Sequence, residues 1–312
     1  MIYDWNIIGH KKQLEMLESD IESGSLAHAY LLCGPGHVGK YTVAKKLASI
    51  LQCENNFCGK CPTCIQIRKG QHLDTMEFEN NREALKINQI REVIARCNMS
   101  SQSKYKIIIL QSIGRMTTEA GNALLKTLEE PPEKTIFIMT TSHVREILPT
   151  IVSRSRVLKF HLFSTEYLEE KLRELYPDSD GEIIQKVAKL SLGRTGQALD
   201  LMNHPDMLAY FLKLYKDILY LLDTNNIVER FAYVEDMVED EKLRRDFLGV
   251  MTHVLRSKVL EGVGGIGEVG GIGTCGAYCG AYCEMLSKTQ DAGILLKQNV
   301  NTRLVLENLM LV

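Results

Sequence analysis

Four cysteines that lie close together along the chain, Cys53, Cys58, Cys61 and Cys64, could bind a metal ion. Thiolates are soft ligands, and four of them suit Zn²⁺, which prefers tetrahedral coordination and has no redox chemistry. Because all four ligands would come from the protein, no position would be left for water, so the spacing predicts structural zinc. A bacterial iron–sulfur sequence would carry its next cysteine at position 68, where this chain has Arg68. Four thiols without a metal are the other alternative.

A second group of residues could bind phosphate. The run from Gly34 through Gly39 to Lys40 follows an apolar stretch and opens a helical one, which is the context of a Walker A loop. In such a loop, backbone N–H groups curl around phosphates, and the lysine reaches the terminal phosphates. The alternative is a glycine turn that carries a surface lysine. The flanking strand and helix favour the phosphate loop.

The residues that would hold Mg²⁺ beside this loop are missing. The position after the lysine needs a short hydroxyl side chain, but it is Tyr41, and Thr42 is rotated by roughly 100° around the helix. An acidic residue should end a neighbouring strand, yet the apolar run 106–110 is followed by Gln111 and Ser112. Nucleotide could bind weakly through Lys40, but the sequence predicts no hydrolysis at this site.

The elements that must position these groups are those of a parallel α/β sheet. Nearly continuous apolar runs, as in strands covered on both faces, alternate with helical patterns. The predicted strands are 29–33, 75–78, 106–110, 135–140 and 157–161. Among the intervening helices is 117–130, which Pro131 and Pro132 end. After residue 163 the strand pattern disappears, and the rest of the chain is predicted to be helical.

Composition limits the class of protein. The chain has 312 residues, of which 45% are hydrophobic and 24% charged, as in an ordinary globular protein. The net charge of −2 gives no overall attraction to nucleic acid, so any DNA contact needs a local patch or partner subunits. No apolar run is long enough to span a membrane, and the first residues lack the pattern of a secretory signal. We therefore expect a cytoplasmic protein with reduced cysteines.

The segment 261–283 is unusual because glycines recur through it and Cys275, Cys279 and Cys283 are evenly spaced. Glycine at this density opposes helix formation, so a flexible loop is predicted. The three cysteines could form a helix stripe or a metal site. Elsewhere, Cys33 and Cys97 are predicted to be small buried hydrophobic residues.

Several stretches carry a family resemblance: Ile8-Gly9-His10, 26–32, the phosphate loop, the cysteine cluster, 122–132 (NALLKTLEEPP), 149–155 and 299–304. Together they resemble the clamp-loader subunits of bacterial DNA polymerase III, which are AAA+ proteins. The resemblance implies an AAA+ domain with a RecA-like parallel sheet and the zinc cluster (1–163), an all-α lid (164–205) and an all-α collar for oligomerisation (206–312, including the glycine-rich insert 261–283).

The resemblance also implies site residues. Ser153-Arg154-Ser155 is similar to the family's Ser-Arg-Cys motif, whose arginine enters the ATP site of the adjacent subunit. Arg154 is therefore expected to act as an arginine finger in trans, the alternative being an ordinary surface arginine. In the lid, Gly196 stands where the hydrolysing subunits carry a sensor arginine. This is a third loss from an ATP site, and it resembles the delta-prime type of subunit more than the tau/gamma type.

The expected function is therefore to help load the sliding clamp at primer–template junctions during DNA replication, without ATP hydrolysis at the chain's own site. The expected partners are the tau/gamma and delta subunits, with the clamp and DNA contacted through the complex. One alternative is an ATP-hydrolysing tau/gamma-type subunit, in which Thr42 or an unrecognised carboxylate holds the metal. An unrelated P-loop protein that contains zinc, such as a small-molecule kinase, is the third possibility.

Overall fold

The computed structural model describes residues 3–55, 57–78, 85–224, 226–264, 275–296, 298 and 300–311, with the backbone alone at 260–264 and 275–279. The chain forms two compact units. The first comprises Met1–Leu175 with Gly193–Leu199, and the second Tyr176–Leu192 with Asp200–Val312. The three-part division at residues 163 and 205 stays a prediction.

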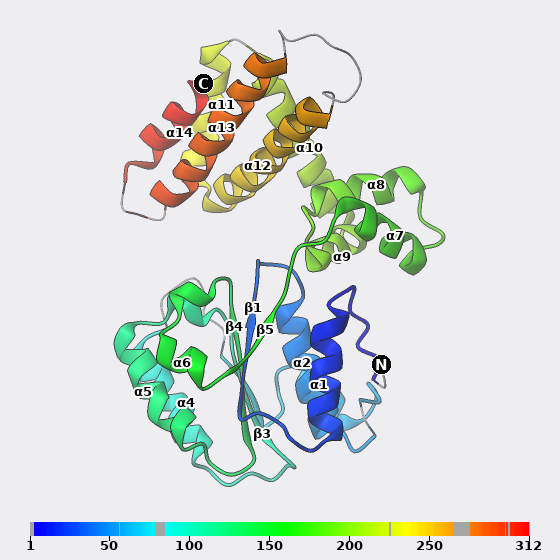
Figure 1. The fold of residues 1–312 in the computed structure, drawn as a ribbon, viewed down its shortest axis with the longest axis vertical. Helices are drawn as coiled ribbons and strands as arrows, with labels where there is room; N and C mark the ends of the chain where they lie inside the picture. The colour runs from blue at the N-terminus through cyan, green and yellow to red at the C-terminus, as the bar shows by residue number, and fades with distance from the viewer. Residues whose placement is uncertain are drawn as a thin grey trace. The chain divides into compact units, whose positions relative to one another are not determined.

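A five-stranded parallel sheet forms the centre of the first unit. Its strands are β1 (Ala29–Cys33), β2 (Thr75–Phe78), β3 (Lys106–Leu110), β4 (Thr135–Thr141) and β5 (Arg156–Lys159), in the order β2-β3-β4-β1-β5. All five predicted strands are confirmed, although β4 ends one residue later than predicted, and β5 begins one residue earlier and ends two residues earlier. Every strand pair is parallel, so each connection crosses over a face of the sheet, and helices cover both faces (Figure 1).

The side chains of each strand alternate between two hydrophobic clusters, one on each face of the sheet. From β1, Tyr30 and Leu32 pack with α1 (Lys11–Glu22) and α2 (Lys40–Gln52), while Leu31 packs with α4 (Ile87–Cys97) and α5 (Thr118–Glu129). All three side chains are fully buried. Burial on both faces explains why the strands read as continuous apolar runs.

Shorter helices complete the first unit. These are α3 (Pro62–Arg68), η1 (Ile113–Arg115), η2 (Val144–Glu146), α6 (Pro149–Ser153) and α7 (Thr165–Leu175). The predicted helix 117–130 is confirmed as α5: its N-cap, Thr117, accepts a hydrogen bond from the backbone N–H of Ala120 (3.3 Å). The first unit therefore has the α/β P-loop fold that the sequence predicts.

The rest of the described chain is helical, as predicted. Its helices are α8 (Gly181–Leu190), α9 (Thr195–Asn203), α10 (Pro205–Asp223), α11 (Ile227–Glu239), α12 (Glu241–Gly264), α13 (Cys275–Leu295) and α14 (Thr302–Met310). Within the second unit, Ile218, Val234, Phe247 and Leu306 are buried side chains from four of these helices. No helix in the described ranges combines the length and apolarity needed to cross a membrane.

The predicted flexible loop at 261–283 is wrong for part of its length. Residues 261–264 end α12 and residues 275–283 begin α13, two helices that pack against each other. Packing between long neighbouring helices can outweigh the weak helix propensity of glycine, which costs about 1 kcal/mol per residue. Residues 265–274 lie outside the described residues, as do Asn299 and the side chains of Cys275 and Cys279.

Candidate functional sites

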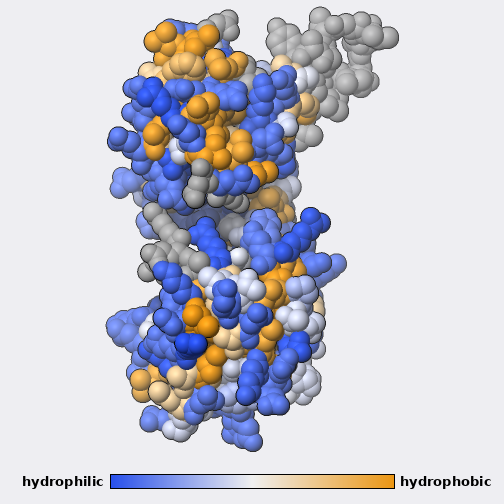
Figure 2. Space-filling model, turned by 90° about the vertical axis from the view of Figure 1, so that its left-hand side faces the viewer, coloured by the Kyte–Doolittle hydropathy of each residue, from blue (hydrophilic) through white to orange (hydrophobic). Residues whose placement is uncertain are grey.

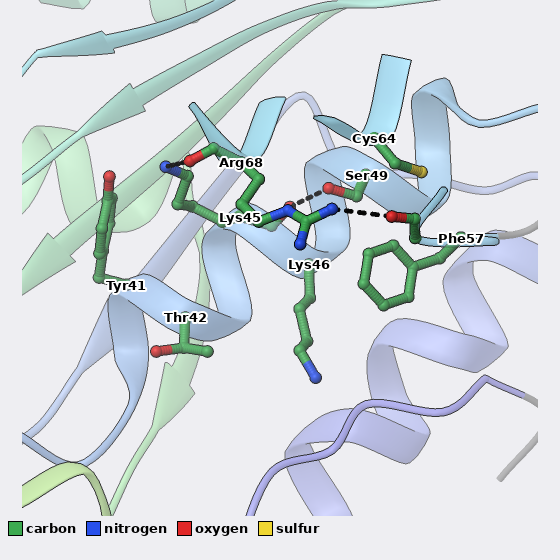
Figure 3. Close-up of a pocket in the computed structure, with 9 residues that line it drawn as sticks. Tyr41, Thr42, Lys45, Lys46, Ser49, Phe57, Cys64 and Arg68 are labelled. Carbon is green, nitrogen blue, oxygen red and sulfur yellow. Dashed lines mark hydrogen bonds between the residues drawn. The ribbon is translucent and has the colours of Figure 1, made fainter. Parts of the chain in front are cut away.

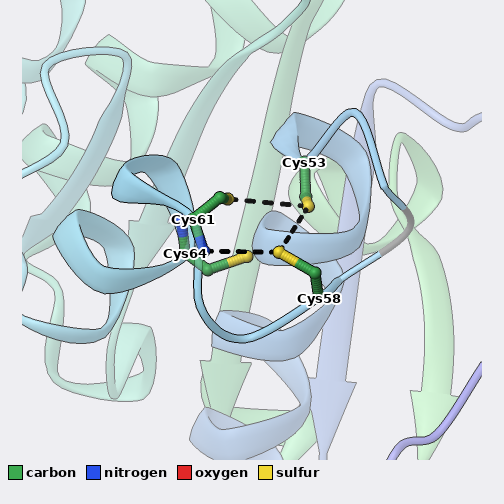
Figure 4. Close-up of side chains that lie close together, drawn as sticks. All are labelled: Cys53, Cys58, Cys61 and Cys64. Carbon is green, nitrogen blue, oxygen red and sulfur yellow. Dashed lines mark hydrogen bonds between the residues drawn. The ribbon is translucent and has the colours of Figure 1, made fainter.

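The four cysteines of the predicted metal site come together at the end of α2 and the start of α3. Cys53 follows α2 as its C-cap, Cys61 is the N-cap of α3, and Cys64 lies in the first turn of α3. Figure 4 shows the four side chains turned toward one another. Their Sγ atoms all lie within 4.8 Å of one another, and the Cys53–Cys58 and Cys53–Cys61 Sγ–Sγ distances are both 3.8 Å.

These distances fit a zinc ion. Four sulfurs placed tetrahedrally around Zn²⁺ at about 2.3 Å would lie ~3.8 Å from one another. Backbone N–H groups support the cluster, because those of Cys61 and Cys64 donate to the Sγ atoms of Cys58 and Cys61 (3.3 and 3.4 Å). Burial raises the pKa of Cys64 to about 12. Since a nearby dication favours the thiolate, a metal would offset that rise. The cluster could therefore hold a metal ion such as zinc.

The phosphate loop lies between β1 and α2, as predicted. Gly39 has a φ of 88°, a backbone conformation that favours glycine. Lys40 begins α2, but its ammonium group is turned back onto the loop and donates to the carbonyl oxygens of Gly34 and Pro35, both at 2.5 Å. Burial lowers the pKa of Lys40 to about 8. In this conformation the Lys40 ammonium group is hydrogen-bonded to carbonyl oxygens of the loop itself.

Tyr41 has an interaction that the sequence did not reveal. Its phenol group hydrogen-bonds to the carboxylate of Glu77 on β2, and the same carboxylate forms an ion pair with Lys45 (3.1 Å). Glu77 is a carboxylate beside the first turns of α2, and sequence reasoning missed it. The local sequence gave no signal, because 36 residues separate the two partners. The hydroxyl at the magnesium position and the neighbouring carboxylate are thus bonded to each other, and Lys45 neutralises the carboxylate.

The two residues that follow β3 have no carboxylate side chain. The backbone N–H of Gln111 donates to the carbonyl of Phe78 (3.0 Å), and that of Ser112 donates to the Thr140 hydroxyl (3.0 Å). These bonds hold the two residues at the edge of the sheet where a P-loop ATPase would have its metal-binding carboxylate. Their side chains can neither bind Mg²⁺ as a carboxylate nor act as a base.

The start of α9 closes against the phosphate loop. The backbone N–H groups of Gly196 and Gln197 both donate to the carbonyl of His37 (2.7 and 3.3 Å). A Cβ atom at position 196 would lie 2.7 Å from that carbonyl oxygen, which is too close for any side chain. An arginine therefore cannot occupy position 196 with this backbone.

A buried histidine lies beside the same loop. His10 packs against the rings of Phe160 and Phe163, with centroids 4.6 and 4.8 Å away. Burial is the main cause that lowers its pKa to about 4, and the charges of His161 and Lys40 act in the same direction. His10 is therefore neutral at pH 7. Sequence analysis gave it no role beyond the family motif.

Arg154 lies on the opposite face of the sheet from these residues, directly after α6. Its guanidinium forms an ion pair with Glu129 at the end of α5 (2.6 Å) and donates to the carbonyl of Thr150 (3.1 Å). The Arg154 and Glu129 side chains are 35% and 48% exposed. The arginine is thus held by partners that face solvent, and no other predicted site residue lies against it. Cys33 and Cys97 are buried, as predicted.

Comparison with known proteins agrees with this fold and these motifs. Residues 9–164, half of the chain, match the family model described as DNA polymerase III, delta subunit. The gamma subunit of DNA polymerase III from Buchnera aphidicola is 32% identical over 65% of this chain and 58% of its own length. The delta' subunit from Pseudomonas aeruginosa is 32% identical over 54% of this chain and 53% of its length.

A solved structure shares the fold along nearly the whole chain. It is a DNA polymerase III gamma subunit-related protein from Thermotoga maritima, with a TM-score of 0.53, 19% identity, and coverage of 95% of this chain and 97% of its own. The matches to the first curated relatives span less than two thirds of their length, 58% and 57% for the two Buchnera gamma subunits. The family-model match covers the P-loop domain in which the cysteine cluster and the phosphate loop lie. The chain therefore belongs to the DNA polymerase III delta-subunit family.

Proposed function

We propose that this chain is a delta-prime-type subunit of the bacterial DNA polymerase III clamp loader. It helps to load the sliding clamp at primer–template junctions, together with tau/gamma and delta subunits, without hydrolysing ATP itself. It instead completes the ATP site of a neighbouring subunit with Arg154. The four-cysteine cluster holds structural zinc, which ties the end of α2 to the start of α3.

The state of the chain's own phosphate loop carries this proposal. ATP hydrolysis needs a cation on the terminal phosphates and Mg²⁺ on a hydroxyl and a carboxylate. Here Lys40 donates to the loop carbonyls of Gly34 and Pro35, while the Tyr41 hydroxyl is bonded to Glu77. The close contact of Gly196 with the His37 carbonyl excludes an arginine at position 196.

The position of Arg154 on the side of the sheet away from its own phosphate loop supports a role at a neighbour's site. It follows α6, which packs on the α5 side of the sheet, whereas the loop leads into α2 on the other side (Figure 1). A guanidinium presents fixed donors to the charge that develops on a transferred phosphoryl group. Leaving Glu129 to reach a phosphate would cost ~1 kcal/mol or less, because the pair is partly exposed.

The second unit offers surface for assembly. Figure 2 shows hydrophobic residues on the face of this unit that is turned toward the viewer. Exposed apolar residues near the C-terminus include Leu304, which is 64% exposed, and Val300, which is 43% exposed. Such residues in a collar would pack against other subunits of the loader.

The second candidate is an ATP-hydrolysing tau/gamma-type subunit, which the matches to gamma and tau subunits favour. Steady-state ATPase activity separates the two, measured on the isolated chain and after assembly with tau/gamma and delta subunits, clamp and primed DNA. We expect no turnover by the chain alone. Turnover comparable to that of the assembled loader would refute the delta-prime assignment.

The phosphate loop offers a direct check. We expect Lys40→Ala to change the rate of clamp loading by less than about threefold, because the adjoining groups already lack the metal chemistry. A decrease of more than tenfold would show that the site still uses nucleotide.

A further inference from the structure

A pocket separate from the phosphate loop lies between α2, α3 and the loop of the cysteine cluster. Its volume is about 320 Å³, within the range of small-molecule sites. Figure 3 shows Tyr41 on one side of it and Phe57 on the other, with Lys46 and Arg68 between them. Lys40, which serves the phosphate loop, is not among the lining residues.

Two aromatic rings and nearby ammonium groups line this pocket. The Lys45 Nζ lies 5.3 Å from the centre of the Tyr41 ring, and the Lys46 Nζ lies 5.7 Å from the centre of the Phe57 ring. Both rings are partly buried, and both line the pocket. Aromatic faces beside cations are the usual means by which proteins bind nucleobases and their phosphates without sequence preference.

The charges around the pocket favour an anion. Three cations, Lys45, Lys46 and Arg68, line it. Two carboxylates lie near these cations: Glu77 forms an ion pair with Lys45, and Asp4 lies near Lys46. These carboxylates offset the charges of the two lysines, so Arg68 is the cation that remains to attract an anion.

Arg68 is the cation best placed to bind that anion. In the described part of the chain it forms no ion pair, and one of its N–H groups donates to the Gly59 carbonyl (2.8 Å). A guanidinium has five N–H donors, so others remain for a ligand. Burial lowers the pKa of Lys46, a cost that a bound anion would reduce.

We propose that this pocket binds a nucleotide unit, with the base against the Phe57 and Tyr41 rings and the phosphate on Arg68 and Lys46. The unit comes from a free mononucleotide or from a single DNA strand, since both present the same base and phosphate. The site does not depend on the proposed clamp-loader role or on the phosphate loop.

The test is fluorescence anisotropy of the full chain with a fluorescein-labelled ten-residue oligothymidylate, with thymidine monophosphate and inorganic phosphate as unlabelled competitors. We expect Arg68→Gln to weaken oligonucleotide binding by about tenfold or more, because a charge-assisted bond to phosphate is lost. Lys69→Gln removes the same charge from the next, exposed residue outside the pocket, and should weaken binding less than about threefold.

Arg68 also donates a hydrogen bond to the Gly59 carbonyl, so Arg68→Gln could weaken binding by disturbing the local fold. A second variant that spares this hydrogen bond is therefore needed. Phe57→Leu keeps an apolar side chain but removes the ring, and should weaken binding by about fivefold or more. Metal content and melting temperature are measured on each variant. Loss of binding in Lys40→Ala would place the nucleotide at the phosphate loop and would overturn the proposal.

Competition by the mononucleotide identifies a free nucleotide as the ligand, and binding of the oligonucleotide alone identifies a DNA strand. Either result supports the site. Equal weakening of oligonucleotide binding by Arg68→Gln and Lys69→Gln would mean that general surface charge, and not this pocket, attracts the oligonucleotide. That result would overturn the proposal. Phosphate competing as well as the nucleotide, or no binding at millimolar concentrations, would overturn it too.

Discussion

Replacing Arg154 with alanine separates a finger in trans from an ordinary surface arginine. In this structure the residue forms one ion pair with Glu129 and one hydrogen bond to the Thr150 carbonyl. The pair is partly exposed, so we expect Arg154→Ala to lower the free energy of unfolding by only ~0.5–1 kcal/mol. A finger contributes on the order of 10³-fold in rate, which corresponds to about 4 kcal/mol of transition-state stabilisation.

The assay is steady-state ATPase of the assembled loader, with assembly checked by gel filtration. Arg154→Ala should lower the rate by about a thousandfold while assembly is retained. Glu129→Gln breaks the same ion pair but keeps the guanidinium, so the rate should fall less than about threefold. Arg145→Ala, at another exposed arginine, controls for the loss of a surface charge. An unchanged rate in Arg154→Ala, or an equal loss in Glu129→Gln, would refute the finger.

Three further predictions concern stability. Metal analysis of the purified chain should find about one zinc per molecule, and chelation should lower the melting temperature; a folded, fully stable chain without metal would reject the zinc site. The folded-state pKa of His10, about 4, lies below its ordinary value of 6.5, so the folded state resists protonation and stability should fall as pH drops from 6.5 to 4. The resulting decrease in the free energy of unfolding is at most about 3 kcal/mol, and His10→Phe should abolish it when denaturant unfolding is measured as a function of pH. The same pH dependence in His10→Phe and the unsubstituted chain would contradict the lowered pKa of His10. Gly196→Ala should destabilise the chain by ~1–3 kcal/mol because its Cβ would press on the His37 carbonyl, whereas Gly249→Ala, which has open space around it, should be neutral or stabilising; equal melting temperatures would argue against the close contact.

The sheet could be predicted from sequence because its determinants are local. The strand 106–110 consists of consecutive apolar residues after Lys106, and the adjoining helices cover both of its faces. The cysteine cluster was equally accessible, since four ligands within one short stretch must lie near one another in any fold.

Contacts between distant segments could not be predicted. The bond between Tyr41 and Glu77 joins α2 to an edge strand, and nothing near Glu77 marks it as a partner. The docking of Gly196 on His37 also depends on how the chain returns after α7 and α8. At 275–283, packing with a neighbouring helix outweighs the local preference of glycine, so a propensity argument failed there.

Gly34 shows why experiments on the phosphate loop need care. A methyl group at this position would meet the carbonyl oxygen of Phe160 at 2.3 Å, and the Gly34 N–H donates to Thr141 at the end of β4. The glycine thus allows three chain segments to meet at one end of the sheet, whether or not a nucleotide binds. A loss of activity in Gly34→Ala would reflect misfolding at this end of the sheet. Only substitutions that leave this junction intact can therefore report on nucleotide use.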